Sequence, residues 1–348
     1  MKLRISTRTV RKLVSAGLTV VLMLVFSLTA DAFWDWRNMG NLFHDAAFLG
    51  LIALGLSFVM IGGGIDLSVG GIVCVAAILA SRFSFMADSS VPGVLVALFA
   101  VLCGAVCGLV NGLLVTRARL TEFVATLATG ILFSGLGLLF AYRDNGRISG
   151  VIVPKGIMND GFLSLGEKVG GSGIFLVTYI WIILSVAMYF VLRRTNFGLH
   201  TYAIGSHNKS AEMSGVNAKR VKAAGFVISG SFAGLASALL TANMTAASAS
   251  LGSNGYEFQA IAACVVGGIA LGGGKGDTVN AVIGAIFLHT ILNGLYKFQI
   301  QAYWSYVIQG MIIIAATAFD ALFTRVSRAL RERRAQLRAD VGKEVAGA

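Results

Sequence analysis

Charged residues are scarce in this chain: 13% of its 348 residues are Asp, Glu, Lys or Arg, whereas 56% are hydrophobic and the mean hydropathy is +0.80. A soluble domain carries about a quarter charged residues, so the composition excludes an ordinary soluble protein. Proline is also rare, with 2 residues against 43 glycines. Apolar content this high excludes a disordered linker. The composition therefore predicts a polytopic membrane protein.

Residues that build catalytic and metal sites are equally scarce. The four cysteines lie singly in apolar stretches, at Cys74, Cys103, Cys107 and Cys264. This distribution argues against a disulfide framework and against a metal site. The four histidines (His44, His200, His207 and His289) show no metal-ligand spacing, and no GxxxxGK[ST] phosphate-binding loop occurs. We therefore expect a chain that is not an enzyme, holds no metal or cofactor, and cannot hydrolyse ATP.

Segments without charged side chains mark the membrane spans, because a helix needs about 20 apolar residues to cross the hydrocarbon core. The chain has such gaps at 13–30, 46–65, 67–81, 89–116, 123–142, 169–192, 223–256, 258–274, 278–296 and 298–319. The gaps 67–81 and 258–274 are short, so Asp66 and Glu257 are expected at membrane level. We predict an all-α polytopic membrane protein of about ten transmembrane helices, with a single domain over residues 1–348.

Basic residues indicate the orientation, because Lys and Arg concentrate in cytoplasmic loops. With the amino terminus inside, 21 of the 28 Lys and Arg fall in inside segments. These segments are 1–12, 116–122, 193–222, 272–277 and 324–348. The four tryptophans fall near the outer interface, where an aromatic belt is expected: Trp34, Trp36, Trp181 and Trp304. We expect both termini in the cytoplasm, with short basic tails at 1–12 and 324–348.

Two terminal features have alternative interpretations. The first 36 residues resemble a secretory signal with a small-residue cleavage site at 30–32, but their apolar run of 18 residues (13–30) favours a retained span. The tail from Arg325 to Lys343 carries seven basic residues. We expect it to contact anionic membrane lipid and no nucleic acid, because it lacks stacking aromatic residues.

Two glycine-rich breaks interrupt the apolar pattern. The first, 62–71, reads GGGIDLSVGG, and the second, 267–277, reads GGIALGGGKGD. Each has a triple glycine followed by an acid, which indicates a weak internal repeat of the kind found in transporters. Glycine unwinds a helix at little cost, but backbone groups freed inside a membrane must pack in protein or line a wet cavity. We expect broken helices here, with Asp66 or Ser68 capping the helix that begins near Leu67 and with Asp66 as a candidate for contact with a solute.

The inside segment 193–222 is too long for a simple turn. Its middle, Lys209–Met213, has a helical pattern that Gly215 would close. By pattern alone, the segment is either a solvated loop or a short amphipathic helix that docks on a soluble partner.

Three stretches together resemble the ribose-type permease family of ATP-binding-cassette importers: GGGIDLSVGG, ARLTEFVATLATG and RRTNFGLHTYAIGSHNKSAEMSGV. The similarity extends from about Asn41 to Phe323. It implies a ten-span subunit of the bacterial plasma (inner) membrane that pairs as a homo- or heterodimer. It also implies a cytoplasmic ATPase and a periplasmic or extracellular sugar-binding protein as partners. The solute would be a monosaccharide such as ribose, another pentose, a hexose or a furanose.

The resemblance also implies roles for individual residues. The residues expected near the translocation path are Gly63, Gly64, Asp66, Ser68 and Asn111. Those expected in an ATPase-coupling loop are Arg194, Thr195, Phe197, Gly198, Tyr202, Gly205, Asn208, Glu212, Ser214 and Gly215. Within this loop we expect Phe197 and Tyr202 to supply apolar contacts to the ATPase. The chain departs from the family at Thr121-Glu122, where prolines are usual, and at Ser134-Gly135, where Arg-Gly is frequent.

A secondary, ion-coupled transporter of a small polar solute is the main alternative, because such proteins also use repeats and broken helices. It would normally need a coupling-ion site. The acids near the spans are few: Asp66, Glu257, Asp277 and Asp320. Copurification of an ATPase and a binding protein would favour the importer.

Overall fold

The computed structural model describes residues 7–86, 91–141, 160–248, 250–251, 254–301, 303–304, 307–315 and 317–318. The basic tail predicted at 324–348 and the first six residues of the tail predicted at 1–12 lie outside the described residues.

The described part of the chain is built of helices, which confirms the all-α class. The long helices are α1 (Thr7–Thr29), α2 (Trp36–Ile61), α3 (Val69–Met86), α4 (Gly93–Thr116), α5 (Glu122–Ala141), α7 (Leu176–Arg194), α10 (Ala218–Met244), α11 (Tyr256–Gly267) and α12 (Thr278–Lys297). The short ones are α6 (Asp160–Leu163), η1 (Ser164–Gly166), η2 (Gly170–Ser172), α8 (Asn196–Ser206) and α9 (Asn208–Met213).

Seven of the described helices are long and apolar enough to cross a membrane, namely α1, α2, α4, α5, α7, α10 and α12. The two short gaps in the charge pattern correspond to shorter apolar helices, α3 and α11. The last predicted span, 298–319, is described only in part and is helical over 307–315. The chain is therefore a polytopic membrane protein, and its charge-free gaps coincide with its helices.

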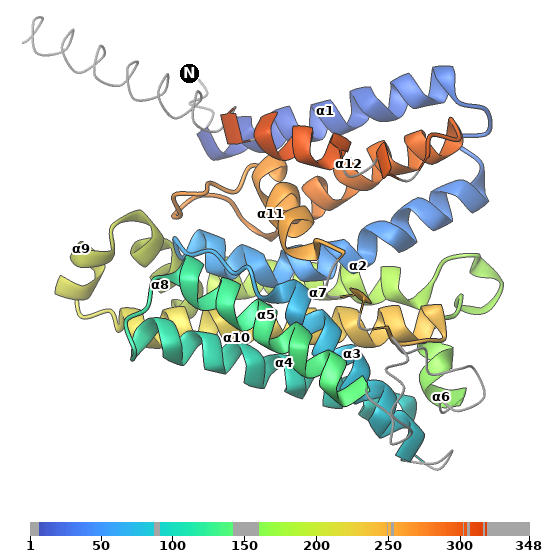
Figure 1. Cartoon of the computed structure of the whole chain (residues 1–348). Helices are drawn as coiled ribbons and strands as arrows, with labels where there is room; N and C mark the ends of the chain where they lie inside the picture. The colour runs from blue at the N-terminus through green and yellow to red at the C-terminus, as the bar shows by residue number, and fades with distance from the viewer. Residues whose placement is uncertain are drawn as a thin grey trace, which may run out of the picture.

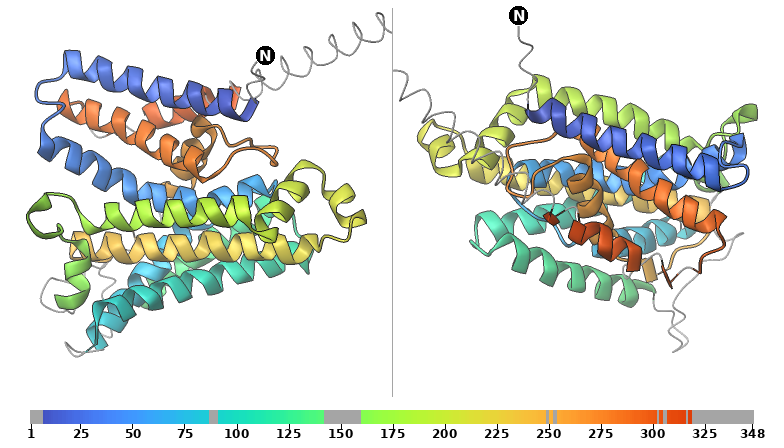
Figure 2. Two further views of the ribbon diagram at one scale, coloured as in Figure 1. Left: turned by 180° about the vertical axis from the view of Figure 1, so that it is seen from behind. Right: turned by 90° about the horizontal axis from the view of Figure 1, so that it is seen from above.

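Helix α2 lies at the centre of the bundle. In the most apolar 18-residue stretch of α2, 89% is buried, whereas only 11% is buried in the corresponding stretch of α1. It packs on α10 at one side and on α11 and α12 at the other, with α1 beyond α12 and α4 beyond α10 (Figures 1 and 2). Two glycines of α2, Gly50 and Gly55, admit bulky neighbours from α7 and α10. Close packing of small residues, rather than hydropathy, places α2 at the centre.

The expectation that Trp181 lies in an outer aromatic belt is wrong. Its side chain is 2% exposed and lies against Gly50, where a Cβ would overlap the indole ring. The missing side chain at Gly50 thus makes room for the indole in the core. The other three tryptophans are exposed, by 53% at Trp34, 64% at Trp36 and 49% at Trp304.

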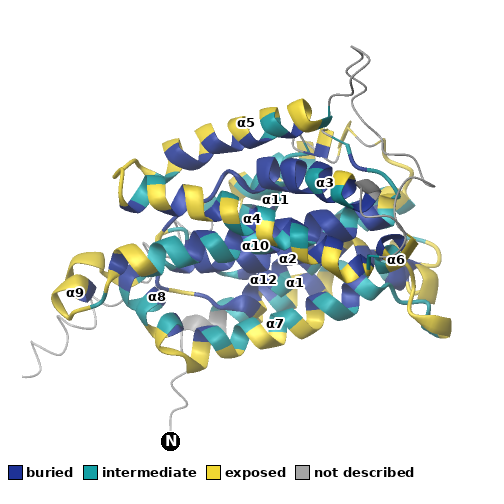
Figure 3. Ribbon diagram, turned by 90° about the horizontal axis from the view of Figure 1, so that it is seen from below, coloured by how far each residue is buried: buried dark blue, intermediate teal, exposed yellow. Residues whose placement is uncertain are grey.

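The outer helices have many exposed residues, yellow in Figure 3, and many of these residues are apolar. Examples are Leu28 of α1, Ile131 of α5 and Ile183 of α7, which are all exposed. A soluble monomer rarely exposes so much apolar surface, so these faces fit contact with lipid.

Helices α4 and α10 approach each other through glycines. A Cβ on Gly104 would overlap the carbonyl oxygen of Gly230, and a Cβ on Gly230 would overlap that of Gly104. Gly108 of α4 and Gly234 of α10 meet the opposite backbone in the same way. Spacing of small residues by four places them on one helix face, which permits close backbone contact within a membrane.

Candidate functional site

The first glycine break joins α2 to α3. Helix α2 ends at Ile61, Gly63 adopts a left-handed conformation (φ +83°), and the amide of Gly64 donates to the carbonyl oxygen of Val59 at 2.9 Å. The chain then runs without helical structure to Ser68, and α3 begins at the next residue. The predicted interruption of the helix is therefore present, and its backbone is packed among neighbouring helices.

Asp66 is completely buried within this break. Its Oδ1 accepts from the amide and the hydroxyl of Ser68, at 3.0 and 2.6 Å. Its Oδ2 accepts from the hydroxyl of Ser229 on α10, at 2.8 Å. Asp66 thus satisfies the Ser68 amide and two hydroxyls directly before α3. Because α3 begins at Val69, the residue at the cap position is Ser68, and Asp66 holds it in place.

Asn111 of α4 extends this network to α5. Its Nδ2 donates to the Ser68 hydroxyl at 2.6 Å, and its Oδ1 accepts from Thr129 at 2.6 Å. The hydroxyl of Thr126 accepts from the amide of Leu67 at 3.0 Å. The side chains of Asp66, Ser68 and Asn111 are fully buried, so in this conformation they join four elements and have no open surface.

The second break joins α11 to α12 and has the same plan. Gly268 ends α11 in the left-handed region (φ +107°), and a fully buried acid, Asp277, caps α12. Asp277 Oδ1 accepts from the Val279 amide at 3.1 Å, while Asn280 Oδ1 accepts from the Asp277 amide at 2.9 Å. Both breaks therefore share the order helix, glycine turn, buried acid, helix, as the predicted repeat would have it.

The two acids differ in their partners. Asp277 Oδ2 accepts from Arg193 of α7 at 2.7 Å and also pairs with Lys12 of α1. These contacts tie α1, α7 and α12 together at one end of the bundle. At Asp66, by contrast, the bonded donors are hydroxyls and an amide.

The two breaks are in direct contact with each other. The amide of Gly274 donates to the carbonyl oxygen of Ile61 at 2.8 Å. A Cβ on Gly273 would lie 2.6 Å from the Cα of Gly63. Helix α8 closes the junction at Gly205, where a Cβ would overlap the same Ile61 oxygen. Glycine is thus required at this junction because three backbone segments meet within van der Waals distance.

The predicted coupling segment forms two helices. The exposed Arg194 ends α7, and the Thr195 hydroxyl caps α8 by accepting from the Gly198 amide at 3.2 Å. Gly198 also packs tightly on the carbonyl of Leu192. Phe197 stacks on Phe58 of α2 with ring centroids 6.1 Å apart.

Tyr202 points its hydroxyl to the second break and donates to the carbonyl oxygen of Gly276 at 2.7 Å. Phe197 and Tyr202 are therefore placed differently from the expectation that they contact a partner. Both lie against the bundle because their rings fill space beside α2 and the second break, and they fix α8 to it.

Helix α9 carries the exposed part of the segment and projects from the end of the bundle (Figure 1). Asn208 donates to Glu212 Oε1 at 3.4 Å, and Ser214 donates to the Ser210 carbonyl at 3.0 Å. Met213 is 90% exposed. Gly215 has φ +84° and ends the turn that leads to α10, as its position in the sequence predicts.

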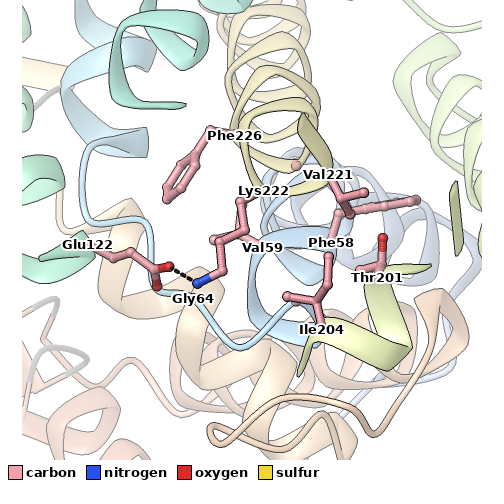
Figure 4. Close-up of a pocket in the computed structure, with 11 residues that line it drawn as sticks. Phe58, Val59, Gly64, Glu122, Thr201, Ile204, Val221, Lys222 and Phe226 are labelled. Carbon is pink, nitrogen blue, oxygen red and sulfur yellow. Dashed lines mark hydrogen bonds and ion pairs between the residues drawn. The ribbon is translucent and has the colours of Figure 1, made fainter. Parts of the chain in front are cut away.

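An ion pair that the sequence reasoning missed lies beside the first break (Figure 4). Lys222 Nζ of α10 donates to Glu122 Oε1 of α5 at 2.7 Å. A Cβ on Gly64 would lie 2.6 Å from the other Glu122 oxygen. The sequence signal was Glu122 in the Thr121-Glu122 pair, where the family resemblance leads one to expect prolines. Its partner Lys222 lies 100 residues away and has no local signal in the sequence.

Two cavities open at this end of the molecule. The one drawn in Figure 4 has a volume of about 10 Å³, which is room for about one water molecule. The second, of about 640 Å³, is lined by Gly63 and Ile65 of the first break and by Glu212 of α9. The first break and α9 thus share one cavity. Within the described residues, no group of His, Cys, Asp and Glu side chains could hold a metal ion.

Buried, broken helices whose backbone is satisfied by neighbouring helices are typical of membrane transport proteins. A sequence model of the family described as "branched-chain amino acid transport system / permease component" matches residues 38–317. The chain belongs to this family; it is a permease component, not an enzyme.

Curated relatives cover most of the chain. It is 37% identical to the ribose import permease protein of Bacillus subtilis (strain 168) over 304 residues, which cover 86% of this chain and 89% of the relative. It is 33% identical to the galactose/methyl galactoside import permease protein of Escherichia coli (strain K12), over 88% of this chain and 94% of the relative. No solved structure matches it significantly. These relatives favour the importer over an ion-coupled transporter.

Proposed function

We propose that this chain is the membrane-spanning subunit of an ATP-binding-cassette importer that takes up a monosaccharide across the bacterial inner membrane. The observation that carries the proposal is the 37% identity to the ribose import permease protein over 86% of the chain. The galactose/methyl galactoside permeases also have a sugar as solute, although the family description names branched-chain amino acids.

The proposed assembly contains two permease chains around one path, as a homo- or heterodimer. A cytoplasmic ATPase drives transport, because this sequence has no phosphate-binding loop of its own. A sugar-binding protein delivers the solute from outside. The single permease domain, 1–348, has both termini in the cytoplasm, since Lys and Arg concentrate on that side, and its basic tails contact membrane lipid.

Helices α8 and α9 supply the coupling segment in this proposal. Helix α9 is exposed and rests on the bundle through the buried Ala211, which packs with Ile204 and Ala218. Helix α8 contacts both glycine breaks, through Gly205 and Tyr202. A displacement of α9 by the ATPase would therefore reach both breaks through one rigid helix.

The first break borders the inner end of the proposed path. Gly63 lines the 640 Å³ cavity, and Gly64 lies beside the Glu122–Lys222 ion pair. The buried hydrogen-bond network of Asp66, Ser68 and Asn111 does not reach the path itself; it fixes the break to α3, α4 and α10. Because the glycines of the break present few side chains to the path, their contacts with the solute would be weak. Weak contacts allow fast release.

Ligand screening of the cognate binding protein by thermal shift tests the substrate class. We expect stabilisation by a pentose or hexose, because ligand that binds only the native state raises the melting temperature. A shift with leucine, isoleucine or a nucleoside, and none with any sugar, would contradict the monosaccharide assignment.

A further inference from the structure

A large polar cavity opens at the end of the bundle opposite α9. Its volume is about 800 Å³, within the range of about 300–1,000 Å³ that small-molecule sites occupy. It is lined by the first turns of α2, the end of α10, the start of α11 and the end of α12. Amide and carboxylate side chains are concentrated there: Asn38, Asn41, Asp45, Asn243, Asn254 and Gln259.

The polar lining comes from stripes on two facing helices. In α2 the stripe is Asn38, Asn41 and Asp45, at the three- and four-residue spacing of one helix face. In α12 it includes His289 and Asn293, four residues apart. The two stripes meet where Asn38 and Asn293 exchange hydrogen bonds, both at 3.1 Å. Polar side chains at such positions in spans are costly and usually line a functional cavity.

The lining keeps unused hydrogen-bond acceptors. Asn243 donates from Nδ2 to the Gly166 carbonyl at 3.1 Å, and Gln259 donates from Nε2 to the Asn254 carbonyl at 2.9 Å. Among the described residues, no donor reaches Asn243 Oδ1 or Gln259 Oε1. The bonded nitrogens fix these amides, and their oxygens retain the lone pairs that accept from hydroxyl groups.

An aromatic wall faces these acceptors. The His44 ring is 8% exposed and lies between Phe48 and Phe175, at centroid distances of 4.9 and 3.9 Å. Its Nδ1 is 2.8 Å from Asp45 Oδ1, whereas its buried Nε2 has no partner among the described residues. The cavity thus combines flat apolar rings with fixed acceptors and a nitrogen that lacks a hydrogen-bond partner.

We propose that this outer cavity is a weak binding site for the monosaccharide after its release from the binding protein; this inference rests on the proposed function. Sugar hydroxyls donate to Asp45 and the amide oxygens, and the C–H face of the sugar ring packs on the aromatic wall. The described lining contains no Lys or Arg. The carboxylate of an amino acid would therefore find no basic side chain there, which favours a neutral polyol over a branched-chain amino acid.

The test uses the assembled permease–ATPase complex in nanodiscs, without binding protein. Saturation-transfer NMR with D-ribose and D-galactose at millimolar concentration measures contact of each sugar with the complex. We expect a signal for the wild type and a loss of at least fivefold in Asn243→Ala and Gln259→Ala, because both residues line this cavity and not the neighbouring groove. Gln301→Ala is the matched control, because Gln301 is an exposed amide at the same end that lines a neighbouring groove instead. It should keep the wild-type signal.

Uptake by the complete importer is measured on the same variants, together with their abundance in the membrane. We expect about tenfold slower uptake in both cavity variants at normal abundance and with normal ATPase association. A wild-type importer that moves neither sugar would overturn the proposed function and this site with it. If the wild type imports sugar and both cavity variants match it in uptake and NMR signal, only the cavity assignment is wrong.

Discussion

Asp66 and Asp277 are both fully buried carboxylates that follow a glycine break, but the two carboxylates have different kinds of hydrogen-bond donors as partners. Asp66 accepts from uncharged donors on Ser68 and Ser229. Asp277 also balances two cations, Lys12 and Arg193. Replacement of each acid by asparagine therefore separates a hydrogen-bonding role from an electrostatic one.

At Asp66 we expect asparagine to be tolerated and leucine to be harmful. Asparagine keeps an oxygen for Ser68, and the Ser229 hydroxyl can reverse to accept from the new NH₂ group. Leucine leaves buried donors unpaired, at about 1–3 kcal/mol for each group. Uptake and membrane abundance, measured together, check this. Full uptake by Asp66→Leu at normal abundance would show that the network is dispensable.

At Asp277 we expect asparagine to be harmful although it preserves the cap. The amide can still accept from the Val279 backbone, but it leaves Arg193 and Lys12 without a counter-charge. Loss of one partner from a buried charged group costs about 2–5 kcal/mol, and the partly exposed cations reduce this to about 1–3 kcal/mol. The melting temperature of the purified protein should fall more for Asp277→Asn than for Asp66→Asn. The reverse order would contradict the assignment of roles.

The sequence permits a helix start to be predicted just after Asp66, because the acid, the glycines before it and the apolar run after it are neighbours in the chain. Its partner Ser229 lies 163 residues away, in an apolar span where a serine carries no visible signal. The same holds for Lys222 beside Glu122. Contacts between distant residues depend on how the helices pack, which a single sequence does not encode locally.

At the scale of elements, α4 and α10 depend on glycines that allow their backbones to touch. Gly104→Ala places a methyl group on the Gly230 carbonyl, and overpacking of this kind costs about 1–3 kcal/mol. Gly135→Ala in α5 is the matched control, because nothing lies within 4 Å of a Cβ there. We expect Gly104→Ala to have a lower melting temperature in detergent than the wild type. Gly135→Ala should have an unchanged or slightly higher melting temperature. Equal melting temperatures would argue that the helices separate at little cost.

Helix α9 is the element that the coupling proposal exposes to the ATPase. Glu212→Lys and Met213→Asp change exposed side chains, so abundance should stay normal while ATPase copurification and uptake fall about tenfold. Val169→Asp serves as a control for ATPase binding, because Val169 is exposed near the other end of the bundle. Should both α9 variants retain the ATPase and transport at the wild-type rate, α9 is a solvated loop segment.

Helix positions follow from the sequence because charged residues separate one apolar span from the next. Helix environments do not, since all the spans are similarly apolar whereas α2 is buried and α1 is exposed. Trp181 shows the consequence. Its position near the end of a span predicts a place at the membrane interface, but the space left by the missing side chain of Gly50 accommodates the indole in the core. Phe197 and Tyr202 show the same effect in the coupling segment, where they contact the bundle.

At the scale of the whole molecule, one end holds the two breaks, α8, α9 and the Glu122–Lys222 ion pair, and the other holds the polar cavity between α2 and α12. In the proposed importer, the solute crosses between these ends and a separate ATPase supplies the energy. The two ends match the two partners proposed for it: an ATPase at α9 and a sugar-binding protein at the cavity.

The central claim is tested most directly by uptake into proteoliposomes that contain this permease with its ATPase. Radiolabelled ribose, galactose and leucine are supplied with the binding protein outside, with ATP or a non-hydrolysable analogue inside. The account predicts uptake of a sugar, only with ATP and only with the binding protein, and none of leucine. Uptake of leucine instead of sugar, or sugar uptake driven by an ion gradient without ATP, would contradict it.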